Sequence, residues 1–404
     1  MSDPEPIPAW WIVGPGEQAP NGGLNGLPEA PPWRAFAKQS DADAAAESAG
    51  DQTGPVEDRG AGFKLDPKQY DIINAAICLR RPLLVRGKPG VGKTMLAYHI
   101  ARQLRLPRVL RWSITSRTQL KDGLYQYDAI ARLQAASLTR HSAPGSYGTQ
   151  GETDNSPVGN QRAVSRPHLR AHMSDASDDP PPIERFMKLG PLGTAFATSR
   201  FRRPRVLLID ELDKSDIDLP NDLLHIFEEG EFEIPELERE TDQPEGGKSK
   251  PARPANSQEG RPVRLPVQGH REETPVLVRD GKVPCRDFPI VIMTTNDERD
   301  FPPAFLRRCL ELDIAPPDEA ALIEIVKSHL GLAADAELDA TYRAIIDAFH
   351  ARRETRDNEL PTDRLLHAIF LAWKHVDIDQ RIERGEPPKD KDALIDCLWP
   401  GETS

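Results

Sequence analysis

The stretch with the most recognisable chemistry runs from Gly87 to Thr94 and reads G-x-x-x-x-G-K-T. It follows the apolar run 83–85 and precedes a segment with helical periodicity, which is the strand–loop–helix setting of a phosphate-binding loop. Its glycines permit backbone torsions that a Cβ would forbid, so successive N–H groups can surround phosphate oxygens. The following helix, expected over 93–104, adds the positive end of its dipole. The pattern predicts that the chain binds a nucleoside triphosphate.

Two side chains of this loop have individual roles. Lys93 would reach the β- and γ-phosphates, and the Thr94 hydroxyl would be a ligand of Mg²⁺. The other residues expected to contact the nucleotide are Gly87, Lys88, Pro89, Gly90, Val91, Gly92 and Met95.

A second candidate site follows the continuous apolar run 206–209, which is typical of a strand buried on both faces of a parallel sheet. Asp210 and Glu211 stand at its carboxyl end, where ligands bind in open α/β sheets. Asp210 would hold Mg²⁺, directly or through water, and Glu211 would act as the general base on the attacking water. The acidic pair predicts hydrolysis in addition to binding.

The composition of the chain indicates its partners and the compartment in which it works. The chain has 404 residues and a formal net charge of −12, which argues against bulk attraction to nucleic acid or to an anionic membrane. Its four cysteines are far apart and show no metal-ligand spacing, as expected of free thiols in a reducing compartment. No apolar run reaches 18 residues. We therefore expect a soluble, cytoplasmic protein that does not enter membranes.

Alternating apolar runs and helical patterns predict an α/β fold, namely a P-loop NTPase core with a five-stranded parallel sheet and helices on both faces. A small all-α lid domain follows, because the pattern after Pro316-Pro317 is only helical. The expected parts are an N-terminal arm over 1–60, the nucleotide-binding domain over 61–315 and the lid over 316–404.

Three segments lack the apolar periodicity of folded elements. The arm 1–60, which is rich in Pro, Gly and Ala, is expected to be disordered, as are polar insertions over about 139–182 and 238–272. The arm also contains tryptophan motifs around Trp10-Trp11 and Trp33. These favour two interpretations equally, a docking peptide for a partner or an arm that packs back on its own domain.

The order of these motifs resembles the AAA+ ATPases, and within them the MoxR branch, over about residues 63–376. The resemblance implies that Asn296, at the end of the apolar run 290–293, is the sensor 1 residue that positions the lytic water. The G-P-L stretch 190–192 is similar to one that MoxR proteins carry before the acidic strand. Residues 232–234 resemble the start of the family's β-hairpin, which 276–278 could complete.

The resemblance also implies roles for arginines. Arg308 falls where MoxR proteins carry the arginine finger that reaches into a neighbouring subunit's ATP, and its neighbour Arg307 replaces an aspartate of the family pattern. Either arginine can be the finger on sequence grounds. Arg364, in the first turn of a lid helix, matches sensor 2, which contacts the γ-phosphate within its own subunit.

By this resemblance the chain would be an ATPase that uses ATP and Mg²⁺ at the subunit interfaces of a homo-oligomeric ring, most plausibly a hexamer. It would remodel a protein partner in a chaperone-like way, for which von Willebrand factor A-domain proteins are the family's usual partners. It also looks similar to ATPases of multi-component bacterial conflict or signalling systems. Two alternatives are a nucleic-acid motor similar to a restriction-system GTPase subunit, and a scaffold that binds ATP without hydrolysing it.

Overall fold

A computed structural model gives the fold of the chain. It describes residues 6–36, 60, 63, 65–142, 182–242, 263–267, 276–333, 336–354 and 360–373. Most of the two expected insertions, residues 37–59 of the arm and the end of the chain after residue 373 lie outside these residues.

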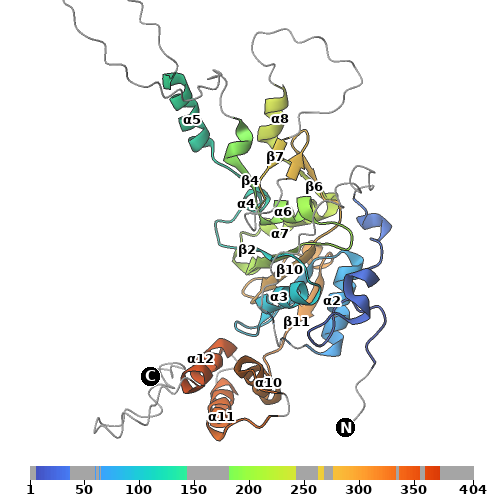
Figure 1. Ribbon diagram of the computed structural model, residues 1–404, viewed down its shortest axis with the longest axis vertical. Coiled ribbons are helices and arrows are strands. Elements are labelled where there is room, and N and C mark those ends of the chain that lie inside the picture. The colour runs from blue at the N-terminus through green and yellow to red at the C-terminus, as the bar shows by residue number, and fades with distance from the viewer. Residues whose placement is uncertain are drawn as a thin grey trace, which may run out of the picture.

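The centre of the molecule is a five-stranded parallel sheet in the order β11-β1-β10-β5-β2 (Figure 1). Its strands are β1 (Leu83–Arg86), β2 (Leu110–Ser113), β5 (Val206–Asp210), β10 (Ile290–Thr295) and β11 (Leu310–Asp313). The register sets Leu83 between Ile292 and Leu310, so β1 is flanked on both sides. The predicted α/β class and the five-stranded parallel core are confirmed.

Successive residues of the three inner strands β1, β5 and β10 enter two separate cores, as period-two alternation requires. One core lies under α2 (Pro67–Leu79) and α3 (Lys93–Gln103), and it receives Leu83 and Val85 of β1. The other lies under α6 (Pro191–Thr198) and α7 (Leu219–Glu229), and it receives Leu84. Helices therefore cover both faces, which explains why the strands read as continuous apolar runs.

Three antiparallel strand pairs stand apart from the central sheet. They are β3 (Tyr125–Tyr127) with β4 (Met187–Leu189), β6 (Glu231–Glu233) with β9 (Lys282–Pro284), and β7 (Val263–Leu265) with β8 (Val276–Val278). The expectation that 276–278 would pair with 232–234 is wrong. A tight turn at Asp280-Gly281, both with positive φ, places β9 beside β6 and leaves β8 for β7.

The helices around these pairs also differ from the sequence pattern. The apolar residues at 120, 124, 127 and 131 follow helical spacing, but the chain forms α4 (Leu120–Leu124), the strand β3 and then α5 (Ala129–Ser142). Within the expected insertions, α5 continues to residue 142, α8 (Pro235–Asp242) extends into the start of the second one, and β7 lies inside it. The expectation of disorder is therefore wrong for the residues in α5, α8 and β7. The remaining residues of the insertions lie outside the described part of the chain.

The C-terminal region forms a small helical unit, as expected. It contains α10 (Glu319–Leu330), α11 (Ala340–Glu354) and α12 (Thr362–Trp373), which gather below the sheet in Figure 1. Their apolar faces share a core of their own that includes Leu322, Phe349 and Leu365. A short helix, α9 (Pro303–Leu306), precedes the last strand of the sheet.

The N-terminal arm packs on its own domain over residues 6–36, so the expectation of a disordered segment is wrong there. Trp11, Ile12 and Val13 are buried in the core of α2 and α3. The side chain of Asn74 on α2 accepts hydrogen bonds from the backbone N–H groups of Ile12 and Val13. Of the two interpretations of the tryptophan motifs, the structure supports packing for Trp11, whereas Trp10 and Trp33 are exposed.

No helix among the described residues is long and apolar enough to cross a membrane.

Candidate nucleotide site

The loop between β1 and α3 has the backbone geometry that its glycines predict. Gly87, Gly90 and Gly92 all have positive φ, at 152°, 78° and 95°. A Cβ on Gly90 would lie 2.4 Å from the Cβ of Pro361, so the loop has no room for a side chain there. Lys88 and Pro89 are exposed, while Val91 and Met95 pack against the α2–α3 core.

Lys93, the first residue of α3, turns its ammonium group back to the loop. Its Nζ donates to the carbonyl oxygens of Gly87 at 2.5 Å and Lys88 at 3.0 Å. It also donates to Asn296 Oδ1 at 2.7 Å, directly beyond the end of β10. The structure thus brings the loop lysine and the predicted sensor residue together.

Burial lowers the pKa of the Lys93 ammonium, and the surrounding carboxylates oppose this shift, Asp213 most strongly. The lysine is 8% exposed, so it has lost most of its water. A cation held in this way by several neutral and negative oxygens is suited to binding a polyanion, because incoming phosphate oxygens would replace the carbonyl groups it now contacts.

Asp210 ends β5 and lies beside Thr94 of the loop helix. Its Oδ1 accepts from the Thr94 hydroxyl at 3.1 Å and from the Thr294 hydroxyl at 2.8 Å. Its Oδ2 accepts from Arg111 on β2 at 2.6 Å. A hydroxyl and a carboxylate at this separation fit a Mg²⁺ that keeps several waters and takes its other ligands from phosphates.

Among the described residues no group of three or more His, Cys, Asp and Glu side chains could hold a metal ion without further help. The Thr94–Asp210 pair therefore fits Mg²⁺ that arrives with a nucleotide, rather than a metal held by protein ligands alone.

Glu211 follows Asp210 in the left-handed conformation, with φ 62° and ψ 52°. Its backbone N–H donates to the Thr294 hydroxyl, which in turn donates to Asp210. Its carboxylate pairs with Lys214 at 2.8 Å, and both side chains are about two-fifths exposed. The predicted base is accessible and directed away from the core, as activation of a water molecule requires.

A cleft of about 450 Å³ opens beside Glu211 at the carboxyl edge of the sheet. Its lining combines side chains of both charges with two hydroxyl groups, from Ile114, Thr115, Ser116, Glu211, Asp213, Lys214, Glu298 and Arg299. The cleft and the phosphate loop lie on the same edge of the sheet, because every strand that contributes is parallel.

The sequence reasoning missed three side chains of this site, which are Arg111, Asp213 and Thr294. Thr294 could have been found, because the alternation of β10 places it on the opposite face from Thr295 and level with the end of β5. Asp213 had no motif to mark it, because its contacts are with the backbone N–H groups of Asn296 and Glu298. Arg111 had no signal, because an exposed arginine on a strand is common.

The two candidate finger residues differ in their surroundings. Arg308 forms an ion pair with Glu228 of α7, and its guanidinium also contacts the carbonyl of Ala304. Arg307 is exposed. The turn that carries both is braced by Arg81, which donates to their backbone carbonyls. Both arginines lie outside the group formed by Lys93, Asp210 and Asn296.

Arg364 lies in the first turn of α12, and its backbone N–H donates to Pro361 O at 3.2 Å. Pro361 is the residue that leaves no space for a Cβ on Gly90. The start of the lid helix therefore lies against the phosphate loop at Pro361, three residues before Arg364.

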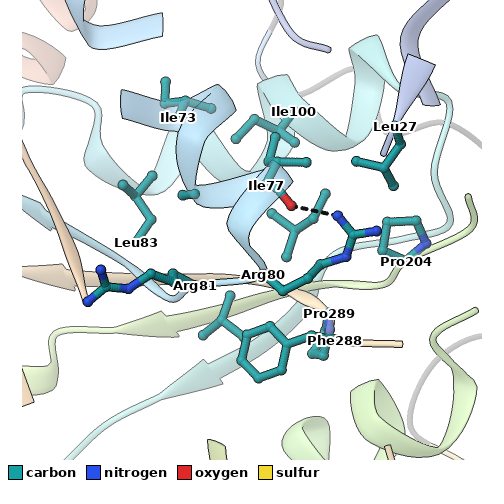
Figure 2. A pocket seen from close by; sticks show the side chains of 13 residues that line it. Leu27, Ile73, Ile77, Arg80, Arg81, Leu83, Ile100, Pro204, Phe288 and Pro289 are labelled. Atoms are coloured by element: carbon teal, nitrogen blue, oxygen red, sulfur yellow. Dashed lines mark hydrogen bonds between the residues drawn. The ribbon is translucent and has the colours of Figure 1, made fainter. Parts of the chain in front are cut away.

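A second, mostly apolar pocket lies at the opposite edge of the sheet, below the amino ends of β1 and β10 (Figure 2). Arg80 enters it, donates to Ile77 O at 2.9 Å and forms an ion pair with Asp287 at 3.1 Å. The free space amounts to about 10 Å³, the size of one water molecule. This pocket is therefore filled by side chains and is too small to be an alternative ligand site.

No protein-family model matches the chain, and no curated protein matches it. Similar solved structures include C. elegans PCH-2, which is 12% identical with a TM-score of 0.28 over 70% of this chain and 53% of that one. Another is NtrX from Brucella abortus in complex with ADP, 12% identical with a TM-score of 0.30 over 71% and 47%. The chain thus spans about half the length of these two proteins. The strand order, with the phosphate loop following β1, gives the core an AAA+ ATPase-like fold.

Proposed function

We propose that this chain is a Mg²⁺-dependent ATPase of the AAA+ type, similar to the MoxR branch, and that it converts ATP and water to ADP and phosphate. One observation carries the proposal. Lys93 contacts Asn296, and Thr94 contacts Asp210, at the common carboxyl edge of three parallel strands. The lysine and the metal ligands of a P-loop NTPase thus meet a polar residue suited to orienting water.

Each residue has a distinct task in this proposal. The backbone N–H groups of the loop and Lys93 hold the β- and γ-phosphates. Thr94 and Asp210 would hold Mg²⁺, which would supply positive charge beside the phosphate oxygens. Asn296 orients the lytic water, and Glu211 accepts its proton.

The site would be completed by a second copy of the chain. We propose that the chain assembles into a ring, most plausibly of six subunits, in which Arg308 or Arg307 of one subunit offsets charge on the γ-phosphate of its neighbour. The exposure of Arg307 and the surface position of the Arg308–Glu228 pair support access to another subunit. Arg364 would link the angle of the lid to the state of the nucleotide.

This cycle would remodel or activate a protein partner, for which von Willebrand factor A-domain proteins are the candidates. Net charge of −12 supports a protein partner over nucleic acid, since a nucleic-acid motor needs a positive surface. Preference for GTP over ATP, with salt-dependent binding of DNA, would instead support the motor.

The direct test measures binding and turnover of ATP and GTP with and without Mg²⁺. We expect Mg²⁺-dependent turnover of ATP by the wild-type chain, and retention of ATP without turnover by Glu211→Gln. Continued turnover in Glu211→Gln would exclude Glu211 as the base. Affinity capture with this variant in ATP, compared with the same variant in ADP, would identify the partner held in the ATP state.

A further inference from the structure

Asp213 is a buried carboxylate that the catalytic scheme above does not use. It lies in the 3₁₀ turn Leu212–Lys214 after β5 and is 4% exposed. The left-handed conformation of Glu211 directs this turn back across the end of β10. An ionised group at such a depth is costly unless polar partners surround it.

Its partners are backbone groups of the loop that contains Asn296. Asp213 Oδ2 accepts from the N–H of Asn296 at 2.8 Å and from the N–H of Glu298 at 3.3 Å. Asp297 between them has φ 60°, so the two N–H groups converge on one oxygen as in an anion-binding nest. The carboxylate therefore sets the path of the chain at the residue whose side chain contacts Lys93.

The second oxygen of Asp213 has a different environment. Oδ1 is buried and has no hydrogen-bond partner among the described residues, although Asp213 lines the 450 Å³ cleft together with Glu211. A buried carboxylate oxygen without a partner carries a desolvation cost, which the two backbone N–H groups on Oδ2 help to offset.

We propose that Asp213 is a positioning residue for hydrolysis, which fixes Asn296 against Lys93 through the backbone of residues 296–298. The assignment rests on the proposed ATPase function for its kinetic part. Its structural part, the restraint of the 296–298 turn, stands independently of turnover.

The test compares Asp213→Asn with Asp213→Glu and with the control Asp218→Asn. Asp218 is an exposed aspartate whose side chain makes no capping bond, so the control removes the same charge nearby. Asp213→Glu keeps the charge and moves the carboxylate by one methylene. Circular dichroism verifies that each variant folds.

Amide hydrogen exchange tests the restraint without reference to activity. We expect both Asp213 variants to exchange the amides of Asn296 and Glu298 about tenfold faster than wild type, and the control to leave them unchanged. Unchanged exchange in both Asp213 variants would overturn the proposal. If wild type shows no turnover, the proposed function fails, and this measurement still decides the role of Asp213.

Kinetics then test the consequence for hydrolysis. We expect Asp213→Asn to lower kcat by about 10- to 100-fold, the usual cost of losing a group that orients a functional one, with KM changed less than about threefold. In the Asn296→Ala background, Asp213→Asn should lower kcat by no more than about twofold further, because the two residues act as one unit. Fully additive losses, or an equal rise in KM, would contradict a positioning role.

Discussion

Lys93 Nζ lies 2.7 Å from Asn296 Oδ1, although 203 positions separate the two residues in the chain. The contact exists because β1 and β10 are parallel neighbours that end at the same edge, so the loop after one faces the loop after the other. It joins the group that would bind phosphate to the group that would orient water.

Replacing Lys93 with Ala should abolish binding of nucleotide. The ammonium is the only cationic side chain of the G-x-x-x-x-G-K-T motif apart from the exposed Lys88, and charge-assisted bonds to phosphate are among the strongest in proteins. We expect at least a hundredfold loss of ATP affinity, or about 3 kcal/mol, by calorimetry. Lys68→Ala, on the exposed face of α2, is the control and should bind as wild type does. Unchanged affinity in Lys93→Ala would remove the phosphate-loop assignment.

Replacing Asn296 with Ala should slow turnover and leave binding nearly intact. The amide would act on the water and the developing charge, and loss of one such donor costs about 10²- to 10³-fold in kcat. ATP affinity should change by less than about fivefold, because the loop and Lys93 still hold the phosphates. Steady-state kinetics with separate binding measurements distinguish the two effects. A loss confined to affinity would make Asn296 a binding residue.

The central sheet and its loop could be predicted because each rests on local patterns. The strands at 206–210 and 290–295 each begin with four consecutive apolar residues and are buried throughout, since both faces of the parallel sheet are covered there. The acidic pair after β5 could be placed for the same reason, since its position relative to the loop follows from parallel strands.

What could not be predicted depends on contacts between distant segments. Leu124 and Tyr127 fit a helical pattern, yet residues 125–127 form a strand because β4, some 60 positions later, supplies the pairing. The arm residues 6–36 lack periodicity, and their order comes from Asn74 and Gln103, whose side chains bond its backbone. Asp213 was missed because its importance lies in the backbone it holds rather than in a motif.

Exchange of subunits should identify the finger. Mixing Arg308→Ala subunits with Glu211→Gln subunits pairs an intact base with an intact arginine at some interfaces, so part of the lost turnover should return. The ion pair with Glu228 is about two-fifths exposed and worth at most about 1 kcal/mol, so it does not prevent Arg308 from reaching a neighbour. Arg307→Ala is the matched control and should keep turnover. The reverse pattern would assign the finger to Arg307, and no rescue in either mixture, with exchange verified, would exclude a finger in trans.

Raising the pH should destabilise the fold through its buried thiols. Burial raises the pKa of Cys309 from 9.0 to about 12, and burial also raises that of Cys285. Below pH 9 both thiols are protonated in the folded and unfolded chain, so they add no pH dependence. Between pH 9 and about 12 only the unfolded chain ionises at Cys309, so stability should fall by up to about 1.4 kcal/mol per pH unit for each thiol.

Urea denaturation at pH 8 and pH 10 measures this dependence, and Cys309→Ala should make it shallower. Alkylation provides a second measurement. Cys78 is half-buried and should react with iodoacetamide before the two buried thiols do. Equal slopes in wild type and Cys309→Ala would contradict the contribution of Cys309.

The packing of the arm on its domain should depend on one side chain of α2. Asn74 is fully buried, accepts from the N–H groups of Ile12 and Val13, and donates to Val13 O. Asn74→Ala would leave these backbone groups buried without partners, at a cost of about 2–4 kcal/mol. If the arm leaves the surface, water can hydrate those backbone groups, and the cost lies at the lower end of this range. If the arm stays in place, the cost lies at the upper end.

Limited proteolysis separates release from loss of the whole fold. In Asn74→Ala we expect cleavage within residues 6–36 at protease concentrations that leave the wild-type arm intact, while the nucleotide-binding domain survives. Asn25→Ala is the control, since Asn25 is exposed on the same arm and should change stability by less than about 0.5 kcal/mol. An arm equally resistant in wild type and Asn74→Ala would mean that the apolar contacts of Trp11, Ile12 and Val13 hold it without the amide.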